Sequence, residues 1–177
     1  MSTKLHWLAP RKAAAVPVTF GVPHHKGALS REEALCLMDD TGRNIPVQSK
    51  HTAFWPDGSV KWTAHSAVLD TSHNYTVEKG KSEAPASAIT ASQDAFGNVT
   101  VESDLLSCRI ENGSRDLISS LLRKQTAQQP MSAKLIGFIE RDKDQRGTEI
   151  HELYKFSGLT TKVTLEEAGP LRAVVKI

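Results

Sequence analysis

Long apolar segments are absent from this sequence of 177 residues, and no run approaches the roughly 20 residues that a membrane-spanning helix needs. The stretch Met1–Pro10 also lacks the apolar central region of a secretion signal. We therefore expect a cytoplasmic protein that has no membrane partner.

Cysteine is scarce, and charge of neither sign dominates. Cys36 and Cys108 lie far apart and fit no metal-binding or redox spacing, so we expect two free thiols and no metal site. The 22 basic and 20 acidic residues give a net charge of +2. Because the basic residues are scattered along the chain, the sequence also argues against a nucleic-acid partner.

Recognisable catalytic motifs are missing as well. The sequence has no glycine-rich phosphate loop, no nucleophile-elbow pattern and no cluster of Cys and His. His24 and His25 are adjacent and point in opposite directions in an extended chain, so we interpret them as part of a solvated loop. Glu149 and His151 would share a strand face, but no third metal ligand is visible. The sequence therefore predicts no catalytic residue and no cofactor.

Short strands separated by turn residues are what the sequence does contain. Val16–Val22 alternates apolar and other residues with period two, which is typical of a half-buried strand. Pro56–Gly58 has the composition of a tight hairpin turn, with glycine in the left-handed position. In the strand after this turn, strict alternation predicts that one face is core and that the other is wetter. The predicted core face holds Val60, Trp62, Ala64, Ser66 and Val68, and the wetter face holds Lys61, Thr63 and His65.

The composition changes in the middle of the chain. Residues 82–96 begin with small residues and one proline, which favours a linker, and strand-like segments resume after it. Leu117–Leu122 is ambiguous, because its leucines and isoleucine are also spaced as on a helix face. We therefore expect an all-β protein with one domain over residues 1–81 and a second over residues 97–177.

An ordered series of motifs in the first domain resembles a known family, the exo-acting rhamnogalacturonan lyases and YetA-like proteins. The series runs through Val16–Pro23, Lys26–Ser30, Asp40–Arg43, Pro46–Gln48 and Trp55–Trp62. The resemblance implies that residues 1–81 form a small RIFT-type β-barrel and that residues 97–177 form the first part of a truncated β-sandwich. It also implies a partner domain, a C-terminal α/α toroid, that this chain lacks.

The resemblance implies a role in acting on pectin. A lyase that acts on a uronic acid needs a base for the C5 proton and a group that neutralises the carboxylate. No such pair is visible, so we expect a non-catalytic portion with a structural or substrate-positioning role, whose partner is an acidic plant-type polysaccharide or oligosaccharide. The alternative is a free-standing carbohydrate-binding β module.

Trp55, Trp62 and His65 are the candidates for contact with a sugar. Trp55 and Trp62, together with Phe54, could form a stacking platform or belong to the barrel core. Because Trp62 alternates with Val60 and Ala64, the core position is favoured for it. His65 is the third candidate, although its place on the wetter face with Lys61 favours packing at the edge of the core or plain exposure to solvent.

Overall fold

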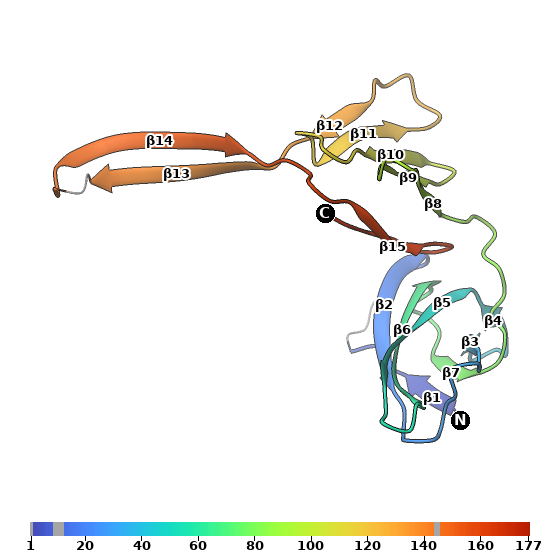
Figure 1. The fold of residues 1–177 in the computed structure, drawn as a ribbon. Helices are drawn as coiled ribbons and strands as arrows, with labels where there is room; N and C mark the ends of the chain where they lie inside the picture. The colour runs from blue at the N-terminus through green and yellow to red at the C-terminus, as the bar shows by residue number, and fades with distance from the viewer. Residues whose placement is uncertain (1, 9–12, 144–145) are drawn as a thin grey trace. The chain divides into compact units, whose positions relative to one another are not determined.

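The computed structural model describes residues 2–8, 13–143 and 146–177, and all regular structure within them is β-strand (Figure 1). The protein is therefore all-β, as the sequence predicts. It divides into two compact units. The first comprises Met1–Ala88 and Gly169–Arg172, and the second comprises Ile89–Ala168 and Ala173–Ile177.

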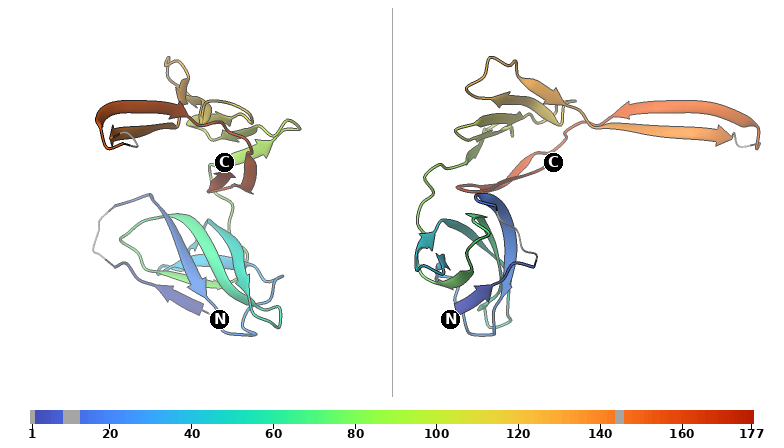
Figure 2. Two further views of the ribbon diagram at one scale, coloured as in Figure 1. Left: turned by 60° about the vertical axis from the view of Figure 1, so that its left-hand side comes forward. Right: turned by 180° about the vertical axis from the view of Figure 1, so that it is seen from behind.

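The first unit is built from two antiparallel sheets that enclose one apolar core (Figure 2). One sheet has the order β1-β7-β3-β4 and the other has the order β2-β6-β5. The strands are β1 (Ser2–Leu5), β2 (Val16–Pro23), β3 (Leu35–Asp39), β4 (Asn44–Ile45), β5 (Val47–Phe54), β6 (Val60–Leu69) and β7 (Tyr75–Lys79). Leu29 and Leu37 are fully buried in the core between the sheets.

The Pro-Asp-Gly hairpin joins β5 to β6, as the sequence predicts. The Gly58 amide donates to the Trp55 carbonyl at 2.9 Å, and the Trp55 amide donates to the Ser59 carbonyl at 2.8 Å. The Asp57 carboxylate accepts hydrogen bonds from both the amide and the hydroxyl of Ser59. Gly58 has a φ of 85°, so the predicted left-handed position is confirmed.

A short distant segment also belongs to the first unit. The side-chain oxygen of Gln48, on β5, accepts hydrogen bonds from the amides of Leu171 and Arg172, each at 2.9 Å. Its side-chain nitrogen donates to the Arg172 carbonyl at 3.0 Å. One amide side chain therefore satisfies three backbone groups of a turn that lies more than 120 residues further along the chain.

The second unit is built around a five-stranded antiparallel sheet with the order β12-β11-β10-β9-β8. Two separate hairpins, β13–β14 and β15–β16, complete it. The strands are β8 (Thr90–Gln93), β9 (Val99–Glu102), β10 (Leu106–Ile110), β11 (Ile118–Arg123), β12 (Met131–Ala133), β13 (Ile136–Lys143), β14 (Glu149–Ser157), β15 (Thr164–Ala168) and β16 (Ala173–Lys176). The core is small, with Val99, Ile110 and Val163 at its centre.

Two segments of the second unit differ from the simplest interpretation of the sequence. Leu117–Leu122, which was ambiguous, lies largely in β11, where pairing with β10 and β12 decides in favour of a strand. Strand β8 lies within residues 82–96, the range predicted to be a linker, because Thr90–Gln93 pairs with β9. Both assignments depend on a neighbouring strand rather than on local composition.

Replacing Gly58 with valine tests the turn. We expect Gly58→Val to lower the melting temperature, since a β-branched residue at a left-handed φ costs about 1–2 kcal/mol. No atom lies within 4 Å of a Cβ built at this position, so the cost is conformational rather than steric. Gly58→Asn is the control. Because asparagine tolerates the left-handed region, this variant should have a melting temperature close to that of the wild type. Thermal unfolding followed by circular dichroism checks both, and equal melting of Gly58→Val and the wild type would contradict this account.

Candidate functional site

Trp62 lies on the outer surface of the β2-β6-β5 sheet, so the predicted core position is wrong. Its side chain is 42% exposed, whereas Thr63 next to it is fully buried. The reason is an irregularity in the β5–β6 pairing: Val60 pairs with Phe54 and Trp62 pairs with Ala53, so Lys61 is an extra residue in β6. An extra residue reverses the alternation of faces. Val60 is therefore buried, and the later residues of the strand exchange sides.

The Trp62 indole lies against the glycine of the neighbouring strand. A Cβ on Gly21 would stand 2.5 Å from the indole Nε1 atom, which is too close for any side chain. The ring therefore rests on the bare backbone of β2. This contact fixes the orientation of the ring while part of its surface stays open to solvent.

Small and polar side chains continue this surface beyond Trp62. Ala64 pairs with Gly21 on one side and with Lys50 on the other, so these three residues share the face of Trp62. One step further along, the hydroxyls of Thr19 and Ser66 are 3.3 Å apart and form a hydrogen bond. Ser66 itself is only 8% exposed, so the open part of this surface carries the Trp62 ring, the Lys50 ammonium group and the Thr19 hydroxyl.

Trp55 and Phe54 each have a cation over one ring face. The Lys61 ammonium lies 4.6 Å from the centroid of the Trp55 ring, and the Arg31 guanidinium lies 4.0 Å from that of Phe54. Trp55 is only partly exposed, and its indole N–H donates to the His24 carbonyl at 3.1 Å. Cation–π contacts of this kind stabilise the hairpin end of the unit. A sugar that stacked on the same face of either ring would have to displace the cation.

His65 is inside the first unit, so its predicted place on a wetter face is wrong for the same reason as that of Trp62. Only 1% of the residue is exposed, and its ring stacks on Phe20 with centroids 5.1 Å apart. His24 is 3% exposed, which corrects its interpretation as part of a solvated loop. Neither ring is placed to meet a polysaccharide.

A chain of hydrogen bonds joins these buried groups. The Thr63 hydroxyl lies 2.8 Å from Nε2 of His24 and 2.7 Å from Nε2 of His65. His65 Nδ1 lies 2.9 Å from the hydroxyl of Ser49, an exposed residue of β5. A threonine hydroxyl has a single proton, which Thr63 can give to one of the two rings or to the Val22 carbonyl, 3.4 Å away. At least one ring must therefore donate its Nε2–H to Thr63.

Burial keeps both rings neutral. It lowers the pKa of His65 from the ordinary 6.5 to about 4, and the charges of His24 and His51 act in the same direction. The pKa of His24 is also lowered, first by burial and then by the charge of His51. The Ser49–His65 contact has the spacing of a nucleophile and its base, but such a low pKa makes His65 a weak base, and the group on its other nitrogen is Thr63 rather than a carboxylate. The arrangement is suited to structure rather than to nucleophilic catalysis.

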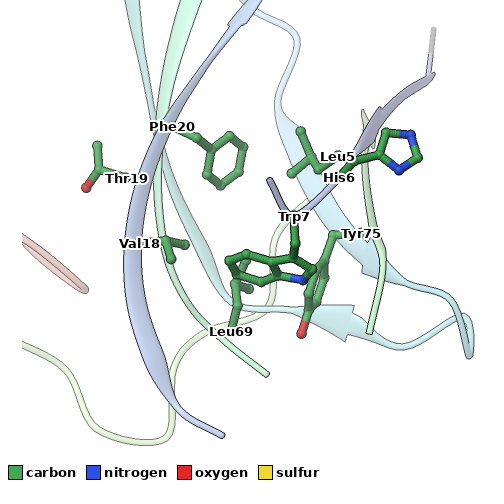
Figure 3. Close-up of a pocket in the computed structure, with 8 residues that line it drawn as sticks. All are labelled: Leu5, His6, Trp7, Val18, Thr19, Phe20, Leu69 and Tyr75. Atoms are coloured by element: carbon green, nitrogen blue, oxygen red, sulfur yellow. The ribbon is translucent and has the colours of Figure 1, made fainter. Parts of the chain in front are cut away.

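An apolar hollow with a volume of about 260 Å³ lies beside Phe20, the residue on which His65 stacks (Figure 3). The aromatic residues Trp7, Phe20 and Tyr75 line it together with His6 and apolar side chains. The Trp7 indole N–H donates to the His73 carbonyl at 3.0 Å, and the Tyr75 hydroxyl donates to the Asp70 carbonyl at 2.8 Å. Sequence reasoning did not place Trp7, because its position depends on β1 pairing with β7, about 70 residues away in the chain.

Within the described part of the chain, no three side chains of His, Cys, Asp or Glu converge as metal ligands would. The same residues form no helix that could serve as a membrane span.

The buried histidines predict a loss of stability in mild acid. The folded pKa of His65 is lowered, so between about pH 6.5 and pH 4 the unfolded chain binds more protons than the folded chain. The contribution is fully present above pH 6.5 and is lost as the pH falls towards 4. When the pH is lowered from 7 to 5, we expect the free energy of unfolding of the wild type to fall by about 2 kcal/mol more than that of His65→Gln. Urea unfolding at both pH values measures this difference.

Other titratable groups are present in both the wild type and His65→Gln, so their effects cancel when the two unfolding free energies are compared. His73, whose pKa is raised by its hydrogen bond to Asp40, has the opposite effect in this pH range but is present in both proteins. An identical pH dependence of the two unfolding free energies would show that His65 is not held neutral by burial.

Comparison with known proteins agrees with this architecture. Residues 1–80 match the PcRGLX-like N-terminal RIFT barrel domain, and residues 88–177 match the PcRGLX-like protein central beta sandwich domain. The protein YetA of Bacillus subtilis (strain 168) is 31% identical over 178 residues, which cover 98% of this chain and 20% of YetA. The chain therefore spans about one fifth of the length of this relative. Its two matched domains, which together account for nearly all of its residues, show that the chain belongs to the PcRGLX-like family.

Proposed function

We propose that the chain is a non-catalytic, substrate-positioning portion of a rhamnogalacturonan-lyase-like protein, and that Trp62 is its sugar-contacting residue. The observation that carries the proposal is that the Trp62 ring is held against Gly21 and is still 42% exposed.

The chemistry of the surface fits an acidic polysaccharide. Aromatic faces suit the apolar faces of sugar rings, and a ring that is already fixed in place loses little conformational entropy when a ligand binds. Lys50 lies on the same face and carries the charge that complements the carboxylate of a uronic acid. The exposed Thr19 hydroxyl adds a donor and an acceptor for a sugar hydroxyl.

The chemistry of the buried histidines supports a non-catalytic role. Abstraction of a C5 proton needs an accessible base with a pKa near the working pH. His65 has a pKa of about 4 and, like His24, is buried. In this proposal the catalytic groups lie in polypeptide outside this chain, for which the family resemblance implies an α/α toroid.

Replacing Trp62 tests the site. We expect Trp62→Ala to weaken binding of acidic rhamnogalacturonan oligosaccharides by at least tenfold, which corresponds to about 1.4 kcal/mol. Gly21→Ala should have a similar effect, since the added Cβ displaces the indole. Isothermal titration calorimetry on this chain measures both.

Val68→Ala is the matched control, because Val68 lies on the same face of β6 and is 45% exposed. This variant should bind like the wild type, and circular dichroism establishes that all variants are folded. Unchanged affinity in folded Trp62→Ala would remove Trp62 from the site. Equal affinity for a neutral oligosaccharide of the same length would remove the acidic substrate class.

A further inference from the structure

The β13–β14 hairpin stands apart from the other strands of the second unit as a two-stranded sheet of its own (Figures 1 and 2). Its pairing runs from Ile136 opposite Ser157 to Lys143 opposite Glu149. Among the hairpin side chains whose exposure the structure describes, six large apolar ones are at least 40% exposed. They are Ile136, Phe138, Ile139, Leu153, Tyr154 and Phe156.

The register divides these side chains equally between the two faces of the ribbon. Residues that pair directly lie on the same face, and alternate residues lie on opposite faces. The first face holds Ile136, Phe138 and Leu153, which are 40%, 59% and 65% exposed. The second face holds Ile139, Tyr154 and Phe156, which are 51%, 49% and 53% exposed. Neither face is the polar, solvent-facing side that an ordinary hairpin has.

Charged residues gather towards the tip of the hairpin, but Lys155 and Ser157 lie near its base, opposite Phe138 and Ile136. Arg141 lies over the Tyr154 ring at 5.6 Å, and the Tyr154 hydroxyl donates to the Glu152 carboxylate at 2.6 Å. At the base, the Phe156 ring lies across Gly137, where a Cβ would stand 2.1 Å from the ring. Near the base, the second face is therefore apolar, whereas the first face combines Ile136 and Phe138 with Ser157 and Lys155.

The apolar surface continues beyond the hairpin. A hollow of about 320 Å³ lies at its base and is lined in part by Leu117, Leu135 and Leu159. Leu135 and Leu159 are themselves 62% and 56% exposed. Leu135 directly precedes β13 and Leu159 lies two residues after β14, so exposed apolar residues extend beyond the ends of both strands.

We propose that both faces of the β13–β14 hairpin are covered by further polypeptide of the same longer protein, so that the ribbon is an inner layer of its central domain. A two-stranded ribbon is marginal in water, and strands that are apolar on both faces are found where layers cover both sides. This chain spans 20% of YetA, so a protein of that length has further polypeptide that can cover the hairpin. The matched family domain is moreover described as a central one.

A second copy of this chain fits the two faces less well. In a symmetric dimer the same patch meets itself, so face-to-face packing covers one face of each ribbon and leaves the other exposed. Two uncovered faces require two covering layers, which polypeptide of the same protein can provide without forming an open-ended assembly.

The test compares two matched variants in the intact, full-length protein. Phe138→Asn alters the first face and Phe156→Asn alters the second, while Glu140→Gln, on the first face, is the control. We expect both asparagine variants to lower the melting temperature and the control to leave it unchanged. Hydrogen exchange on the unaltered protein gives a second measurement that does not depend on variants folding. The β13 and β14 amides should exchange at least about tenfold more slowly in the intact protein than in this chain alone.

Each alternative outcome would overturn the proposal. Equal exchange in the intact protein and in this chain would show that the hairpin remains uncovered. A lowered melting temperature in only one asparagine variant would limit the cover to one face. Self-association of this chain in sedimentation experiments, if abolished by either variant while exchange in the intact protein is unprotected, would identify a second copy as the occupant.

Discussion

A single extra residue in β6 determines the chemistry of both sides of the first unit. Lys61 has no partner in the β5–β6 register, so Val60 and Thr63 point inwards although they are three residues apart. Had the alternation continued unbroken from Val60, His65 would face solvent and Trp62 would fill the core. The irregularity therefore places a polar chain inside the unit and an aromatic ring outside it.

The interior can hold two histidines because each polar atom has a partner. Thr63 connects His24 to His65, and Ser49 completes the chain at the exposed edge of the sheet. Unpaired, such groups would each cost about 1–3 kcal/mol in a buried position. Among the described residues, no buried side-chain nitrogen or oxygen is left without a hydrogen bond. The energetic cost of burying the two histidines is instead electrostatic, because burial disfavours the protonated form of each ring.

Features set by neighbouring residues could be predicted from the sequence, and features set by distant partners could not. The all-β class, strand β2 and the turn around Gly58 follow from alternation and turn composition, and the family resemblance follows from motifs close together in the chain. The exposure of Trp62 and the burial of His65 depend on an irregular register with β5, which leaves no signal in either strand alone. Trp7 and His24 owe their positions to β7 and β6, and the strand form of Leu117–Leu122 depends on its two partners.

Each unit contains a glycine covered by the ring of a neighbouring strand, Gly21 under Trp62 and Gly137 under Phe156. Glycine weakens a strand, and a ring that crosses it restores the packing that the missing side chain would have provided. Each of the two pairs also favours one register between its strands. A slip of two residues keeps every side chain on its own face, so hydrophobic patterning alone does not oppose it. Such a slip would bring the Trp62 indole over Thr19 or Pro23, and the Phe156 ring over Leu135 or Ile139, where side chains occupy the space that each glycine leaves open.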